Sequence, residues 1–155
     1  MTSAAAKLDV ARLNAFYGPI QILFDVGFSV GRGEVVALLG RNGAGKSTTF
    51  KSLMGLVDRR EGEIRFEDAE ISRQPTYEIA RRGLGYVPED RRVFGELTVE
   101  ENLEVGRQPA RDGVTTWTPE RLYALFPNLA EMRRRPGGQM SGGEQQMLTI
   151  SRTLM

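Results

Sequence analysis

The stretch that most limits how this chain can fold is Gly40-Arg-Asn-Gly-Ala-Gly-Lys-Ser47, which has the form Gly-x-x-x-x-Gly-Lys-Ser. It follows a short apolar run at residues 35–39 and precedes a helix expected at about residues 46–54. A short apolar run bounded by glycines is typical of a strand buried on both faces of a sheet, so we expect residues 35–39 to form a central buried strand. A strand, a glycine-rich loop and a helix in this order match the P-loop pattern in full.

The P-loop pattern has a direct chemical meaning. Its glycines let the backbone curl so that successive N–H groups point at phosphate oxygens, and the helix beginning at Gly45 adds partial positive charge. Lys46 is expected to reach the β- and γ-phosphates, and the Ser47 hydroxyl to bind Mg²⁺. The alternative is a glycine-rich turn that matches by chance, which the lysine, the serine and the strand–loop–helix context disfavour. The predicted nucleotide-binding residues are Gly40, Arg41, Asn42, Gly43, Ala44, Gly45, Lys46, Ser47 and Thr48.

A second glycine-containing motif, Met140-Ser-Gly-Gly-Glu-Gln-Gln146, begins the last predicted helix. Ser141 and Glu144 have the spacing of a capping box. Two glycines at a helix start expose backbone N–H groups and Ser141 supplies a hydroxyl, so Ser141, Gly142, Gly143 and Glu144 form a candidate anion site. An ordinary capped helix start explains the motif equally well on its own. The upstream P-loop favours the anion site.

The remaining elements follow from local patterns. Strands are expected where β-branched and aromatic residues gather between turns, and helices where capping or proline signals begin a run. Further strands are predicted at residues 8–17, 22–30, 62–66 and 84–87, and helices at 76–82, 98–105 and 118–126, with loops at 106–116 and 133–139.

Composition excludes some classes of function. The net charge is +1 and gives no reason to propose a nucleic-acid partner; the short arginine clusters are most simply solvated surface. The chain has no cysteine, which excludes disulfides and thiolate metal sites, and no histidine, the commonest general base. No apolar run approaches the ~18 residues of a membrane span. We expect a soluble, cytoplasmic chain.

With both motifs in place, the chain resembles the ATP-binding subunits of ABC transporters throughout its length. The motif at Met140 is close to the family's signature sequence, which usually starts with leucine and has glutamine where Glu144 stands. The resemblance implies an α/β fold: a P-loop NTPase core at about residues 8–97 with antiparallel N-terminal strands, a helical subdomain at about 98–140, and a signature helix at 141–155. It implies ATP and Mg²⁺ as ligands and ATP hydrolysis by the full-length protein.

The resemblance also assigns roles to two residues outside these motifs. Tyr17 stands where the family has an aromatic side chain that stacks on adenine, although a core tyrosine at a strand end is the alternative. Gly85-Tyr-Val-Pro-Glu89 occupies the position of the family's Q-loop, with Glu89 in place of the usual glutamine. A carboxylate can still bind the metal, so Ser47 and Glu89 are the predicted Mg²⁺ ligands.

The finer resemblance is to the second ATP-binding subunit of branched-chain amino acid importers, carried by residues 86–94, 97–103 and 140–148. It implies a dimer in which each P-loop faces Ser141, Gly142 and Gly143 of the other subunit. The implied partners are a second ATP-binding subunit (identical or different), membrane permease subunits and, indirectly, a periplasmic or extracellular binding protein, with no nucleic acid. The implied location is peripheral, on the cytoplasmic face of the inner (plasma) membrane.

Three alternatives stay open at this point. A related amide or urea importer subunit would look alike, a soluble ABC protein would act without a membrane partner, and another P-loop enzyme such as a small-molecule kinase would lack the signature. The family also carries, beyond the signature helix, the Walker B strand with a Mg²⁺-binding aspartate and a general-base glutamate, and then a switch histidine. We therefore expect an N-terminal fragment, truncated before the Walker B strand, that lacks catalytic residues. It should bind nucleotide without turning it over, and should be prone to aggregation because residues 35–39 would lack a neighbouring strand.

Overall fold

The computed structural model describes residues 6–110 and 113–155. The chain divides into two compact units, Met1–Leu84 and Gly85–Met155, and each is described by itself. The predicted loop at 106–116 lies partly outside the described residues, because 111 and 112 are not among them. The domain boundaries predicted from the sequence stay predictions.

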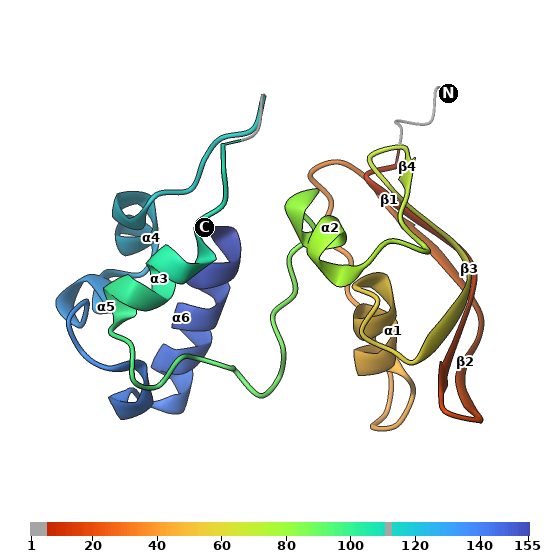
Figure 1. Ribbon diagram of the computed structural model, residues 1–155, viewed down its shortest axis with the longest axis horizontal. Coiled ribbons are helices and arrows are strands. Elements are labelled where there is room, and N and C mark those ends of the chain that lie inside the picture. The colour runs from red at the N-terminus through yellow and green to blue at the C-terminus, as the bar shows by residue number, and fades with distance from the viewer. Residues whose placement is uncertain (1–5, 111–112) are drawn as a thin grey trace. The chain divides into compact units, whose positions relative to one another are not determined.

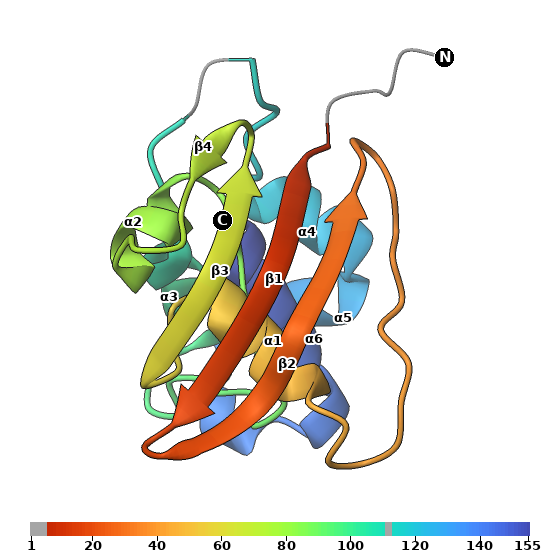
Figure 2. The same cartoon turned by 90° about the vertical axis from the view of Figure 1, so that its right-hand side faces the viewer.

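The first unit contains a four-stranded antiparallel sheet in the order β2-β1-β3-β4. Its strands are β1 (Leu8–Tyr17), β2 (Ile20–Val30), β3 (Arg59–Phe66) and β4 (Ala69–Glu70). The first two form a hairpin whose turn contains Gly18 at a φ of 53° (Figure 2). The predicted antiparallel N-terminal strands are therefore confirmed.

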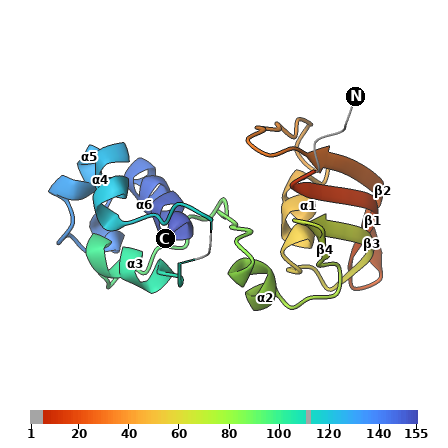
Figure 3. The same cartoon turned by 90° about the horizontal axis from the view of Figure 1, so that it is seen from above.

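Helix α1 (Lys46–Leu53) covers one face of this sheet, as Figures 2 and 3 show. Buried side chains on β1 and β3 face this interior, among them Leu13, which is fully buried, and Ile64. A second helix, α2 (Thr76–Arg81), follows the sheet and buries Ile79. The core of the first unit thus fixes the helix that the P-loop precedes.

Two predicted strands are absent. Residues 35–39 and residues 84–87 form no strand, and the side chains of Val35 and Leu39 are 95% and 88% exposed. The prediction of a central buried strand at residues 35–39 is wrong for the structure described. A short apolar run becomes a strand only where a neighbouring strand satisfies its backbone groups. None of the four strands among the described residues pairs with either run.

The second unit is helical. It contains α3 (Val99–Gly106), α4 (Pro119–Leu125), α5 (Pro127–Glu131), a 3₁₀ turn at Gly137–Gln139 and α6 (Gly142–Leu154) (Figure 1). Its core comes from every α-helix of the unit and comprises Val99, Leu103, Leu122, Leu129, Met140, Leu148 and Met155. Pro127, expected to end a helix, also begins α5, because proline suits the first position of a helix.

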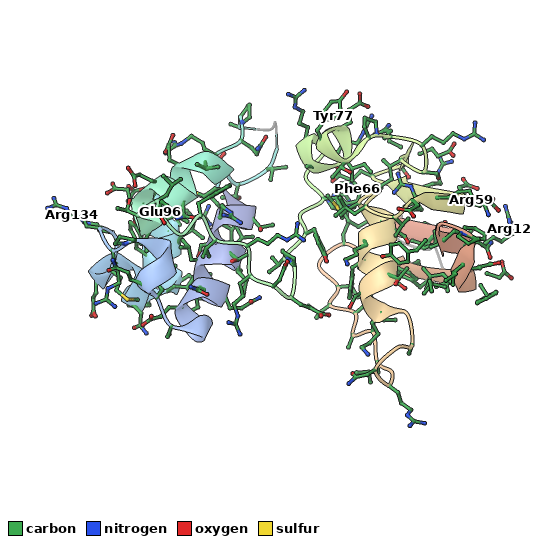
Figure 4. The ribbon with its side chains drawn as sticks, turned by 60° about the horizontal axis from the view of Figure 1, so that its bottom comes forward. Arg12, Arg59, Phe66, Tyr77, Glu96 and Arg134 are labelled. Carbon is green, nitrogen blue, oxygen red and sulfur yellow. The ribbon has the colours of Figure 1, made fainter. Side chains whose placement is uncertain are left out.

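The surface agrees with the sequence on one further point. Figure 4 shows the side chains of Arg59 and Arg134 extending outward from their units, as expected for the arginine clusters. Arg60 departs from this expectation, because it is half-buried and binds backbone carbonyls. Among the described residues, no helix is long and apolar enough to cross a bilayer.

Candidate nucleotide-binding site

The loop before α1 has the backbone of a glycine-dependent turn. Gly43 and Gly45 adopt φ values of 83° and 90°, in the left-handed region that side chains disfavour. A Cβ atom at Gly45 would also lie 2.7 Å from Cδ2 of Leu23 on β2. Gly45 is therefore required twice, for its backbone conformation and for the close approach of the loop to the sheet.

Lys46 lies across this loop. Its Nζ donates hydrogen bonds to the carbonyl oxygens of Gly40 at 2.8 Å and Arg41 at 3.0 Å. The backbone N–H of Ala44 donates to the same Arg41 carbonyl at 3.1 Å. Neutral carbonyl oxygens thus hold the ammonium group at the loop. The first turn of α1 contains no acidic residue that could neutralise its charge.

The start of α1 has no cap of its own. Gly45 occupies the N-cap position and no side chain makes a capping hydrogen bond there. The first backbone N–H groups of a helix have no partner within the helix and carry partial positive charge. Ser47 and Thr48, both half-buried, lie in this first turn. The loop and helix start therefore offer the backbone donors and partial positive charge that a phosphate group needs, and Mg²⁺ binding at Ser47 stays a prediction.

The other end of α1 is fixed by Arg60 on β3, a residue that the sequence did not identify. Its guanidinium donates to the carbonyls of Ser52 and Leu53 at the end of the helix. It also donates to the carbonyls of Ile71, Ser72 and Gln74 at 2.7–3.1 Å. Burial lowers the pKa of Arg60. A cation at a helix C-terminus is favourable, so Arg60 stabilises the helix that presents Lys46.

Tyr17 ends β1 and is half-buried, in the same unit as the P-loop. Its stacking on adenine stays a prediction. Glu89 is exposed and lies in the second unit, whereas Ser47 lies in the first. A metal site shared by these two residues stays a prediction.

The second motif forms the capping box that its spacing predicts. Glu144 accepts a hydrogen bond from the backbone N–H of Ser141 at 2.7 Å, and Ser141 Oγ accepts from the N–H of Glu144 at 3.4 Å. The hydrogen bond from the Ser141 backbone, followed by that from its hydroxyl, lowers the pKa of Glu144. Ser141 and Gly143 are exposed, and a Cβ at Gly143 would meet no atom within 4 Å. The site is thus open to a ligand but already holds a carboxylate.

The segment after Glu89 has an unusual backbone. Arg91 and Arg92 adopt φ values of 61° and 42°. Both carbonyls are bound by side chains of α6: that of Arg91 by the Thr149 hydroxyl, and that of Arg92 by Arg152 at 2.6 Å. Sequence patterns gave no signal for these contacts, because they join residues about sixty positions apart.

Comparison with known proteins places these features in a family. The ABC transporter family profile matches residues 23–155. The chain is 44% identical over 148 residues to the high-affinity branched-chain amino acid transport ATP-binding protein BraG of Pseudomonas aeruginosa, covering 96% of this chain and 64% of that protein. It is 36% identical over 151 residues to the lipopolysaccharide export system ATP-binding protein LptB of Escherichia coli K12, covering 96% and 63%. The chain therefore spans less than two thirds of the length of these relatives.

Solved structures agree. The chain matches an ATP-binding subunit of an ABC transporter with a TM-score of 0.76 at 33% identity, over 94% of this chain and 60% of that one. It matches a nucleotide-free ATP-binding cassette from an ABC transporter with a TM-score of 0.75 at 26% identity, over 96% and 64%.

Proposed function

The chain belongs to the ABC transporter family, and from this premise we propose that it is the ATP-binding part of a subunit that energises an importer of branched-chain amino acids. The observation that carries the proposal is the loop before α1. Lys46 lies over the carbonyls of Gly40 and Arg41, next to a helix start that no side chain caps. This arrangement offers a cation and backbone donors to the phosphates of ATP.

We assign the ATP contacts to the loop from Gly40 to Gly45, to Lys46 and to the first turn of α1, with Tyr17 as the proposed adenine contact. Ser47 and Glu89 are separate proposed ligands of Mg²⁺, which would neutralise charge between the β- and γ-phosphates. Lys46 would stabilise the negative charge of the terminal phosphate, and the loop would fix its position.

The second motif has a proposed role in a dimer. Ser141, Gly142 and Gly143, with Glu144 as their cap, would contact the nucleotide held by another ATP-binding subunit. The exposure of Ser141 and Gly143 supports this, because a contact with another chain requires an accessible surface. Membrane permease subunits, and indirectly a periplasmic or extracellular binding protein, are the other proposed partners. The proposed location is the cytoplasmic face of the membrane.

Binding is tested by calorimetric titration of the chain with ATP, with and without Mg²⁺. We expect saturable binding that weakens when Mg²⁺ is withdrawn. A folded chain that takes up no ATP in either condition would contradict the assignment of the loop.

The transported solute needs a separate test, because the similarity extends to an exporter subunit as well as to an importer subunit. A chimera in which this chain replaces the matching 148 residues of BraG can be supplied to a Pseudomonas aeruginosa strain that lacks BraG, and uptake of labelled leucine measured. Restored uptake supports the proposal. Restored lipopolysaccharide export by the corresponding LptB chimera in a strain deficient in LptB, without restored leucine uptake, would favour the exporter.

A further inference from the structure

Helix α6 contacts residues 91–98, and these contacts indicate how that segment is held in place within the second unit. Helix α6 begins with the motif at Ser141, and residues 91–98 follow Glu89 in the chain. Both parts belong to the second unit, so their contacts are defined by that unit alone.

Arg152 makes two polar contacts and one ring contact with this region. Its Nη2 donates to the carbonyl of Arg92 at 2.6 Å, and its Nη1 to Oδ1 of Asn102 at 3.3 Å. Its guanidinium carbon lies 4.8 Å from the centre of the Phe94 ring. One side chain of α6 thus contacts the segment near its start, at its middle and through Asn102.

Asn102 extends these contacts to the rest of the segment. It is fully buried on α3, and its Oδ1 accepts from the backbone N–H of Phe94 at 3.0 Å. Its Nδ2 lies within hydrogen-bond distance of the carbonyls of Phe94, Leu97 and Thr98, at 2.9–3.0 Å. Arg152 and the Phe94 N–H therefore share one acceptor atom, Oδ1 of Asn102. Because Asn102 links the two, removing the Arg152 side chain should weaken the hydrogen bond of the Phe94 N–H.

The backbone at Arg91 and Arg92 shows why such contacts are needed. Two consecutive non-glycine residues with positive φ are unfavourable, and persist only where surrounding contacts hold them. Thr149 and Arg152, one turn apart on α6, bind the two carbonyls of this pair. The strained pair lies two residues after Glu89, so its conformation sets the course of the chain there.

We propose that Arg152 is a positioning residue, which fixes residues 91–98, and with them the chain after Glu89, to the helix that begins with Ser141. The inference rests on the proposed function only in giving Glu89 and Ser141 their roles. The physical claim is that removing the guanidinium frees this segment while leaving the helices folded. The guanidinium, with several donors in a fixed plane, can reach the Arg92 carbonyl and Asn102 at once, which an ammonium group cannot easily do.

The test compares Arg152→Met, which keeps most of the aliphatic side chain, with Arg152→Lys, which keeps the charge on a single donor nitrogen. Arg121→Met is the matched control, because it removes an arginine that lies over a ring, Trp117, in the same unit. Thr149→Val removes the hydroxyl that contacts the carbonyls of Arg91 and, within α6, of Gln145, and gives a second, milder variant. Amide hydrogen exchange is followed by NMR at Phe94 and Leu97, and at Leu148 within α6, together with thermal unfolding.

We expect Arg152→Met to accelerate exchange at Phe94 by about tenfold, a change of roughly 1.4 kcal/mol in opening free energy, with Leu148 protected as in the unchanged chain. Arg152→Lys should restore part of the protection, and Arg121→Met should change neither amide.

Unchanged exchange at Phe94 in Arg152→Met, or equal acceleration at Phe94 and Leu148, would overturn the proposal. If Arg152→Met fails to fold, Arg152→Lys decides: exchange at Phe94 as slow as in the unchanged chain would overturn the proposal. Calorimetry with ATP on the same samples separates the two proposals: absent ATP binding would contradict the proposed function without affecting the exchange result.

Discussion

The two glycine-containing helix starts of this chain differ in what balances the partial positive charge of their first backbone N–H groups. Helix α1 starts at Gly45 with no capping side chain and no acidic residue in its first turn, and a lysine lies over the preceding loop. Helix α6 starts at Ser141 with a complete capping box that ends in the carboxylate of Glu144. The first start lacks an anion, whereas the second contains one. The comparison indicates that a glycine-rich helix start binds phosphate strongly only when no side chain of the protein occupies its first backbone N–H groups.

The largest expected effect is at the uncapped start. Lys46→Ala removes the cation that faces the phosphates, and charge-assisted hydrogen bonds are worth about 1.5–3 kcal/mol. We expect ATP affinity to fall roughly ten- to hundredfold in calorimetric titration. Lys51→Ala, which removes the same charge from the last turn of α1, is the control and should change affinity little. Equal losses in the two variants would mean that only net charge matters.

The two starts also differ in what their glycines do. Gly45→Ala places a side chain at a φ of 90° and 2.7 Å from Leu23, so we expect a loss of about 1–3 kcal/mol of stability in chemical denaturation. Gly143→Ala meets no atom within 4 Å and replaces a helical glycine, so it should be neutral or stabilise by up to about 1 kcal/mol.

If Gly45→Ala and Gly143→Ala lower stability equally, the conclusion that the fold requires glycine at position 45 but not at position 143 is wrong. If Gly143→Ala leaves stability and monomer ATP binding intact but weakens ATP-dependent association of the chain, the open space at Gly143 serves a partner and not the fold.

How far these features follow from sequence depends on how far apart the interacting residues lie. The capping boxes at Thr98 and Ser141 form as predicted, because their hydrogen bonds join residues three positions apart. Residues 35–39 look like a strand by every local criterion, yet remain exposed, because a strand exists only through a partner that local sequence cannot supply. Arg60 and Asn102 give no local signal either, since an arginine or asparagine is normally a surface residue.

The third expected effect compares two capping boxes. Ser141→Ala and Thr98→Ala each remove an N-cap oxygen, and each should lower stability by about 1 kcal/mol in thermal or chemical unfolding. Neither should change ATP affinity of the monomer. Only Ser141→Ala should weaken ATP-dependent self-association, measured by sedimentation, since only Ser141 is proposed to contact a partner's nucleotide. A weakened monomer affinity in Ser141→Ala would place the residue in the chain's own ATP site.

The smallest effect concerns the carboxylate already present at the second start. Hydrogen bonds from Ser141 lower the pKa of Glu144, so its stabilising contribution is present above the ordinary carboxyl pKa of about 4.3 and is lost as the pH falls through the lower folded value. Glu144→Gln keeps an oxygen that can accept from the Ser141 N–H but carries no charge. Unfolding curves of the two chains from pH 7 to pH 3 should therefore differ at neutral pH and converge under acid conditions. A difference that does not change with pH would show that the charge of Glu144 contributes nothing.

The same substitution sharpens the comparison between the helix starts, because it makes the second start electrostatically more like the first. The negative charge of Glu144, next to Ser141, repels an approaching phosphate, so Glu144→Gln should strengthen ATP-dependent association slightly while weakening the helix at neutral pH. Glu101→Gln is the matched control: Glu101 caps α3 through the same reciprocal hydrogen bonds with Thr98, which also lower its pKa. It should reproduce the altered pH dependence of unfolding without affecting association. If Glu144→Gln instead weakens association, the cap orders the helix start for its ligand, and the ordering outweighs the repulsion between the two negative groups.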